Sequence, residues 1–161
     1  MIGPIVGVMG PGGTARDEDV TVAEALGRRI AEAGWTLLTG GRDAGVMAAA
    51  NRGAKAAGGT TIGVLPGATR EGLSPDVDLP IVTGLGNARN AVNVLSSDIV
   101  VACGMGLGTA SEIALALKTG KPVILLNGDE RSRAFWTALS PRRVHVAGDV
   151  DTAIRTIQDL L

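Results

Sequence analysis

The stretch from Cys103 to Glu112, CGMGLGTASE, combines residue types that bind a phosphate with a carboxylate that could be catalytic. Three glycines at alternate positions leave backbone N–H groups open to an anion, and Thr109 adds a hydroxyl. The stretch follows the apolar run 98–102 and leads into IALALK (113–118), so the glycines stand where a strand turns into a helix. The pattern fits a phosphate cradle with the Glu112 carboxylate behind it. On spacing alone, it equally fits a helix capping box formed by Thr109 and Glu112.

Arg89 lies in a second glycine-containing segment, TGLGNARN (83–90), in the first turn of a predicted helix. A cation there opposes the helix dipole and is unfavourable unless an anion compensates for it. We therefore expect Arg89 and Glu112 to meet across one phosphate site, where they form the candidate catalytic pair. Asn87 and Asn90 flank the arginine, either as ligand donors or as simple helix caps.

A parallel sheet is needed to bring these residues together. Apolar runs without alternation are separated by helical segments, which is typical of parallel strands covered on both faces. Predicted strands cover residues 4–9, 35–39, 60–65, 80–83, 98–102, 122–126 and 143–146, and predicted helices cover 20–33, 45–57, 87–96, 110–118, 132–139 and 151–161. Thr21 and Glu24 are expected to cap the first helix. The sequence predicts a doubly wound α/β fold with a mostly parallel sheet of six or seven strands, as one domain over residues 1–161.

Glycine follows each of the first six predicted strands. The carboxyl ends of parallel strands meet at one edge, where open α/β sheets bind ligands. A turn needs one glycine, whereas three of these loops carry clusters of two or three, so we expect a site for an anionic small molecule. Its expected ligand-binding residues are Gly10, Gly12, Gly13, Gly40, Gly41, Gly84, Asn87, Arg89, Gly104, Gly106, Leu107, Gly108 and Thr109.

Composition and missing motifs argue against several classes of protein. The net charge is −1 and the basic residues are scattered, so neither nucleic acid nor a membrane surface is expected as a partner. With no leader-like segment and no apolar run near the ~20 residues of a membrane span, the expected location is the cytoplasm. One cysteine and one histidine leave no protein-only metal cluster; Cys103 is expected to be an inert core thiol. The Walker Gly-Lys-Ser/Thr and the dinucleotide G-x-G-x-x-G are both missing.

Three segments resemble the LONELY GUY-like superfamily of Rossmann-type nucleotide-binding proteins: GGRDAGVMAAANRGAKAAGGTTIGVLP (40–66), ARN (88–90) and SDIVVACGMGLGTASEIALALKTGKPVILL (97–126). The resemblance is closest to the molybdenum-cofactor carrier-like branch. Phosphoribohydrolases of the superfamily carry Pro-Gly-Gly-x-Gly-Thr-x-x-Glu and an upstream arginine, and cleave the N-glycosidic bond of a nucleoside 5′-monophosphate. The positions that match are Arg89, Gly106, Gly108, Thr109 and Glu112. The positions that depart are Gly104, Met105 and Ser111.

The resemblance leaves three functions open. The first is binding of a phosphorylated ligand, either an AMP-like purine nucleotide or the molybdenum cofactor, a phosphate-bearing pterin, with no cofactor required. The second is the hydrolysis just described, in which Glu112 assists water or stabilises oxocarbenium-like charge and Arg89 orients the phosphate or ribose. The third is a regulatory nucleotide sensor. The resemblance also implies a homodimer or tetramer.

Lysine decarboxylase activity, a label often given to such proteins, does not fit the sequence. A pyridoxal-phosphate enzyme needs a Schiff-base lysine. The lysines are Lys55, Lys118 and Lys121, all of which are expected to be solvated and remote from the glycine edge.

Overall fold

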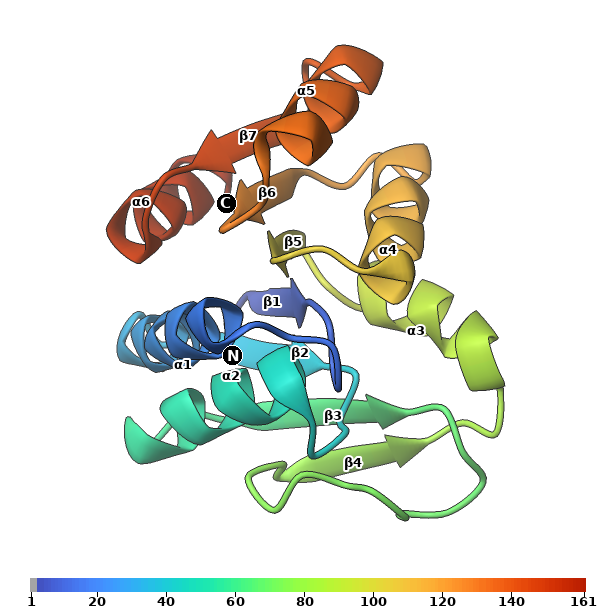
Figure 1. Cartoon of the computed structure of the whole chain (residues 1–161). Helices are drawn as coiled ribbons and strands as arrows, with labels where there is room; N and C mark the ends of the chain where they lie inside the picture. The colour runs from blue at the N-terminus through green and yellow to red at the C-terminus, as the bar shows by residue number, and fades with distance from the viewer. Residues whose placement is uncertain (1–2) are drawn as a thin grey trace.

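The apolar runs of the sequence form seven strands of one sheet, in a computed structural model that describes residues 3–161 (Figure 1). The strands are β1 (Ile5–Met9), β2 (Thr36–Thr39), β3 (Thr61–Leu65), β4 (Leu79–Val82), β5 (Ile99–Cys103), β6 (Val123–Leu126) and β7 (Val144–Ala147). Their order is β4-β3-β2-β1-β5-β6-β7, and every neighbouring pair is parallel. The doubly wound α/β fold expected from the sequence is confirmed.

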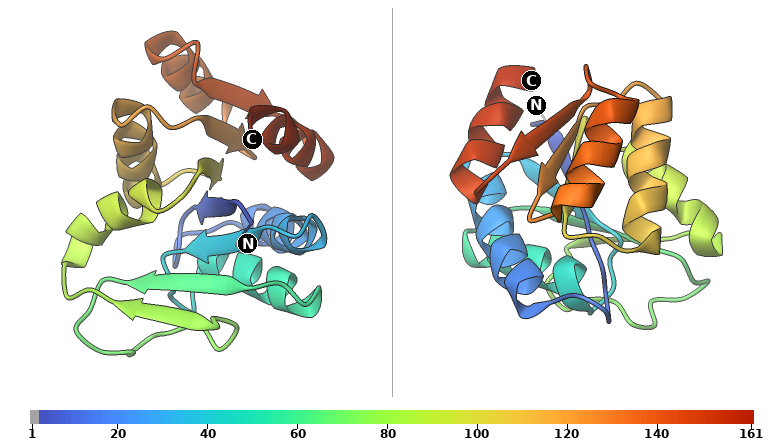
Figure 2. Two further views of the ribbon diagram at one scale, coloured as in Figure 1. Left: turned by 180° about the vertical axis from the view of Figure 1, so that it is seen from behind. Right: turned by 45° about the horizontal axis from the view of Figure 1, so that its top comes forward.

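Within residues 3–161, six α-helices cover the two faces of the sheet: α1 (Asp17–Glu32), α2 (Gly45–Ala56), α3 (Arg89–Leu95), α4 (Leu107–Lys118), α5 (Glu130–Leu139) and α6 (Val150–Leu160). A short 3₁₀ turn, η1 (Gly86–Ala88), precedes α3. Figures 1 and 2 show α1, α2 and α6 on one face and α3, α4 and α5 on the other. Each face has its own apolar core; Leu26 and Ile154 lie in the first, and Ile113 and Trp136 in the second. Over the same residues, no helix combines the length and apolar character needed to cross a bilayer.

The strand order reverses between β1 and β5. From β1 the chain moves outward through β2, β3 and β4, then returns to β5 and continues in the other direction. At such a switch point the loops after the two central strands diverge, and doubly wound proteins bind ligands in the crevice between them. The loop 10–16 follows β1 and the loop 104–106 follows β5, so the fold places these two glycine-rich loops side by side.

Helices α1 and α4 begin three residues earlier than the sequence predicted, and both expected capping boxes are wrong. Helix α1 begins at Asp17, before Thr21, because the acidic run 17–19 stabilises the positive end of the helix dipole. Asp19 accepts a hydrogen bond from the Arg16 backbone N–H at 3.0 Å. Helix α4 begins at Leu107, directly after Gly106, so Thr109 stands inside the first turn and cannot be the cap residue.

Candidate functional site

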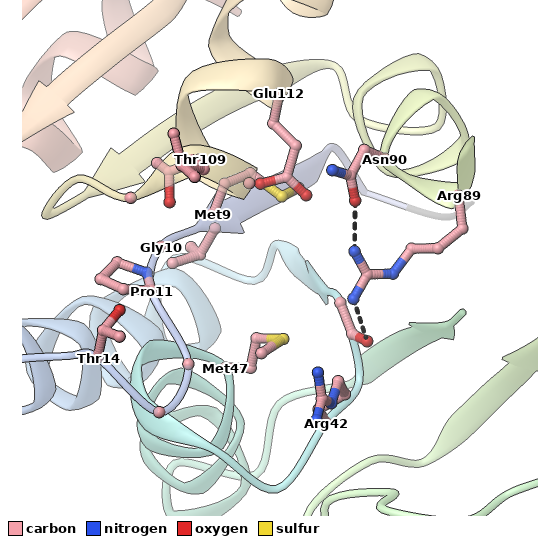
Figure 3. A pocket seen from close by; sticks show the side chains of 17 residues that line it. Met9, Gly10, Pro11, Thr14, Arg42, Met47, Arg89, Asn90, Thr109 and Glu112 are labelled. Carbon is pink, nitrogen blue, oxygen red and sulfur yellow. Dashed lines mark hydrogen bonds between the residues drawn. The ribbon is translucent and has the colours of Figure 1, made fainter. Parts of the chain in front are cut away.

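A cavity of ≈ 230 Å³ opens at the carboxyl edge of the sheet, between the loops that follow β1 and β5 (Figure 3). Its walls come from these two loops, the β2–α2 loop and the first turns of α2, α3 and α4. Because β1 and β5 flank the switch point, the cavity lies where a doubly wound sheet binds its ligands.

Most of the residues expected to bind ligand line this cavity. They are Gly10, Gly12, Gly13, Gly40, Arg89, Gly106, Leu107, Gly108 and Thr109. Glu112 also lines it, so the fold brings the two candidate catalytic side chains to one cavity. The remaining four, Gly41, Gly84, Asn87 and Gly104, lie outside its lining.

Several glycines at this edge are required by packing inside the protein. A Cβ on Gly10 would lie 2.4 Å from the carbonyl oxygen of Cys103, and one on Gly40 would lie 2.7 Å from Met47 Sδ. Gly104 has a φ of +76°, and its Cβ would lie 2.8 Å from the carboxylate carbon of Asp19. These glycines therefore allow close contacts between segments of the chain, whether or not a ligand is bound.

Four other glycines leave their backbone open to the cavity. A Cβ on Gly13 or Gly108 would meet nothing within 4 Å, and one on Gly12 or Gly106 would meet its nearest atoms at 3.4 and 3.5 Å. Gly106 and Gly108 belong to the β5–α4 turn, while Gly12 and Gly13 face them from the β1–α1 loop. A ligand can reach backbone N–H groups closely at these four positions.

Thr109 presents a buried hydroxyl without a partner. The side chain is 2% exposed and lines the cavity, and within residues 3–161 its Oγ1 makes no hydrogen bond. The first N–H groups of a helix, here those of Leu107, Gly108 and Thr109, have no acceptor within the helix, and the helix dipole gives this end a positive potential. A buried polar group without a partner is costly, so this end of α4 is built to receive an acceptor.

Arg89 begins α3, and its guanidinium is held by oxygens of the protein's own neutral groups. Nε donates to the Val64 carbonyl at 3.0 Å, Nη2 to the Gly40 carbonyl at 3.4 Å, and Nη1 to the Asn90 side chain. Three of the five guanidinium N–H groups are thereby used, which leaves two for a ligand. Burial lowers the pKa of Arg89, and the charge of Arg42 lowers it further, while that of Glu112 raises it. An arginine nevertheless keeps its proton, so the cavity holds a fixed positive charge.

Glu112 lies in the second turn of α4 and is 6% exposed. Its Oε1 accepts a hydrogen bond from Asn93 Nδ2 of α3 at 2.9 Å. Burial raises the pKa of Glu112, and this effect outweighs the opposing effects of Asn93 and Arg89. In the part of the chain that the structure describes, Glu112 and Arg89 form no ion pair, although they share the cavity. Two arginines and one acid whose neutral form burial favours make the cavity positive.

Glu112→Gln is expected to stabilise the unliganded protein at neutral pH. Because the pKa of Glu112 is raised on folding, the folded state binds more protons than the unfolded state between the two pKa values, and stability falls as pH rises through that window. Glutamine keeps an oxygen for Asn93 without a buried charge. At a pH above both pKa values, we expect the free energy of unfolding to rise on the order of 1 kcal/mol, or Tm by about 2–4 °C. Below the unfolded-state pKa we expect no gain. Denaturant unfolding across the acid-to-neutral range measures it; a loss at neutral pH would contradict the reasoning.

Several residues that the sequence had not indicated as ligand-binding also reach the cavity, among them Thr14, Arg42 and Met47. Arg42 follows the glycine pair of the β2–α2 loop, and Arg89 likewise lies in a glycine-containing segment at the same edge of the sheet. The exposed guanidinium of Arg42 makes no hydrogen bond or ion pair with residues 3–161. Met47 stands in a run of small residues on α2, and nothing in its local sequence points to the cavity.

Asp19 supports the two glycine loops from outside the cavity. It is 2% exposed and accepts hydrogen bonds from Arg16 Nη2 at 3.0 Å and Asn127 Nδ2 at 2.7 Å. Burial alone would raise the pKa of Asp19, but these hydrogen bonds outweigh it and hold the pKa below its ordinary value. The neighbouring Cys103 thiol donates to the Asp19 carbonyl at 3.5 Å, and burial raises its pKa to about 12. Cys103 is 0% exposed, so its expected core position is confirmed. Throughout residues 3–161, no three His, Cys, Asp or Glu side chains gather into a metal-binding group.

Comparison with known proteins gives a consistent assignment. A molybdenum cofactor binding protein from Rippkaea orientalis is 54% identical, with a TM-score of 0.97 over 99% of this chain and 98% of the other. The molybdenum cofactor carrier protein of Chlamydomonas reinhardtii is 54% identical, with a TM-score of 0.94 over 98% of both chains. A cytokinin riboside 5′-monophosphate phosphoribohydrolase of Mycobacterium tuberculosis is 33% identical over 68% of this chain and 63% of its own length.

The resemblance noted from the sequence is confirmed: the chain is more similar to these molybdenum cofactor proteins than to this hydrolase. The model of the SLOG cluster4 family matches residues 3–154, and the chain belongs to that family.

Proposed function

We propose that this chain binds a phosphorylated small molecule, with the phosphate at the N-terminus of α4 and facing the β1–α1 loop. The observation that carries the proposal is the Thr109 hydroxyl, buried in the cavity lining with no partner within residues 3–161. The open backbone at Gly106 and Gly108 and the helix dipole act on the same point. The spare donors of Arg89 add a cation to the same cavity.

The molybdenum cofactor is the ligand we propose first, as cargo that the protein holds without changing it. Two solved relatives at 54% identity are a molybdenum cofactor binding protein and a molybdenum cofactor carrier protein. The residues present suit such a ligand, because its phosphate matches the donors at α4 and the cavity carries two guanidiniums against one buried acid. Thr109 and the α4 amides would hold the phosphate, and Arg42 and Arg89 would offer donors to the rest of the molecule.

The second candidate is hydrolysis of a nucleoside 5′-monophosphate, favoured by the placement of Arg89 and Glu112 in one cavity. Burial raises the pKa of Glu112, as it does for many general bases, and Asn93 already holds one of its oxygens. We rank binding above hydrolysis because the two molybdenum cofactor proteins are 54% identical to this chain and the hydrolase is 33% identical.

Thr109→Val and a product assay test this ranking. The purified protein is titrated calorimetrically with ribose 5-phosphate and AMP, then incubated with AMP and N6-substituted AMP while free base is measured. We expect binding without release of base. Thr109→Val should weaken both ligands about ten- to hundredfold, the usual size of a hydrogen bond to a charged group. Its Tm should not fall, because the hydroxyl has no partner to lose. Base release that Glu112→Gln abolishes would instead establish the hydrolase.

Self-association through the α3–α4 face also belongs to this proposal. Leu107 is 95% exposed at the start of α4, and Leu85 is 51% exposed directly before η1, the turn that leads into α3. Exposed apolar side chains beside a site are typical of a surface that a second chain covers. The homodimer or tetramer expected from the resemblance agrees with this surface.

A further inference from the structure

The cavity has an apolar floor that a phosphate group does not need. Val8, Met9 and Met47 line it, and Met9 is 2% exposed and Met47 9% exposed. Figure 3 shows both methionines between Pro11 and Thr14 on one side and the two arginines on the other. The phosphate donors at α4 and the β1–α1 loop therefore occupy one end of the cavity, and apolar thioether surface continues from them toward Arg42 and Arg89.

The glycines on both sides leave room for the Met47 side chain. A Cβ on Gly40 would lie 2.7 Å from its Sδ, and a Cβ on Gly12 would lie 3.4 Å from its Cε. Met47 thus spans the floor from the β2–α2 loop to the β1–α1 loop. A side chain at position 40 would overlap Met47 Sδ, so the glycine there leaves the space that Met47 occupies in the cavity.

A thioether of this kind is suited to the face of a flat ring. Methionine sulfur is polarisable and makes favourable contacts with aromatic rings. The polar groups of the cavity include two guanidiniums with spare donors, two N–H groups on Arg89 and all five on Arg42. A ring edge that faces these guanidiniums must offer acceptors. Heteroaromatic rings with carbonyl oxygens and ring nitrogens have this chemistry.

From this geometry we infer that Met47 is the platform on which a planar heteroaromatic ring of the ligand lies, and that it makes the site select ring-bearing phosphates over ring-free ones. The inference rests on the proposed function, since it requires the phosphate to be held at α4. It adds the second half of the ligand: a planar ring whose edge carries hydrogen-bond acceptors.

Two probes separate the two halves of the ligand. GMP carries a phosphate and an oxo-substituted ring, whereas ribose 5-phosphate carries the phosphate alone; calorimetry gives both dissociation constants for each variant. Met47→Ala should weaken GMP about five- to tenfold and change ribose 5-phosphate by less than about twofold, and Met47→Leu should retain most of the GMP affinity. Met105→Ala is the matched control. Met105 lies in the β5–α4 loop and packs against the core, but it does not line the cavity. It should leave the preference for GMP unchanged.

Equal weakening of both probes by Met47→Ala would overturn the inference, because it would mark a general distortion of the site. A wild-type protein that binds GMP no more tightly than ribose 5-phosphate would also overturn it, while leaving the phosphate site intact. Failure of the wild-type protein to bind either probe would contradict the proposed function itself. The Tm of each variant shows whether lost affinity reflects lost structure.

Discussion

Gly45→Ala is expected to lower the free energy of unfolding by about 3 kcal/mol and to weaken binding of the phosphorylated ligand. Gly45 begins α2 with a φ of +50°, a conformation that alanine adopts at a cost. Its Cβ would lie 2.1 Å from the Gly12 carbonyl oxygen and 2.4 Å from that of Pro11. Both are backbone atoms of the cavity wall, and Val46 N–H donates to the Pro11 carbonyl at 3.0 Å. The substitution must therefore displace the wall.

Gly13→Ala is the matched control for this effect. Nothing lies within 4 Å of a Cβ at Gly13, so its free energy of unfolding should stay within about 0.5 kcal/mol of wild type. Its affinity for ribose 5-phosphate should still fall, because the added methyl group occupies space offered to the ligand. Denaturant unfolding and calorimetry on both variants measure the two effects separately. A Gly45→Ala protein as stable as wild type would show that the wall yields without cost, and unchanged binding in Gly13→Ala would place the phosphate elsewhere.

The glycines show how far the sequence could predict the site. Their position after successive strands predicted the correct edge of the sheet, because the parallel arrangement follows from apolar runs between helices. The count of glycines, however, does not distinguish a glycine that admits a ligand from one that admits another part of the chain. Gly10 is crowded by the Cys103 carbonyl and Gly104 by the Asp19 carboxylate. Such contacts join residues more than eighty positions apart, which no local pattern contains.

Helix starts failed for a related reason. Two S/T-x-x-E patterns predicted capping boxes, but a pattern of four residues competes with every other signal nearby. At α1 the acidic run before Thr21 decides the start, and at α4 the extended backbone at Gly106 does so. Glu112 is then free to turn toward Asn93 of α3, a partner supplied by the fold and not by the helix itself.

Arg89 lies in the cavity as the sequence predicted, but the groups that compensate its charge at the helix start differ from those expected. The sequence argument held that a cation at a helix start needs an anion. In the structure, carbonyl oxygens of Val64 and Gly40 and the Asn90 side chain supply the compensating negative ends of dipoles. The end of β3 and the β2–α2 loop bring these carbonyls to α3, so the partner groups come from the sheet topology.

Arg89→Ala is expected to weaken binding of GMP by about 1.5–3 kcal/mol, or roughly ten- to hundredfold. The guanidinium is fixed by three hydrogen bonds, so it meets the ligand without further loss of side-chain entropy. Arg89→Lys should recover only part of the loss, because an ammonium group keeps the charge but cannot hold Val64, Gly40 and Asn90 at once. Calorimetric titration of each variant gives the comparison.

Arg42→Ala provides the matched control, since it removes the same charge from the same cavity. Arg42 is exposed and makes no hydrogen bond or ion pair with residues 3–161. Arg42→Ala should therefore lower the affinity less than Arg89→Ala does, and added salt should shrink this difference from wild type more strongly. Equal losses at Arg42 and Arg89 would mean that the cavity attracts the ligand by net charge alone. A larger, salt-resistant loss at Arg89 would show that its fixed orientation matters, because a buried and oriented donor is screened far less than an exposed one.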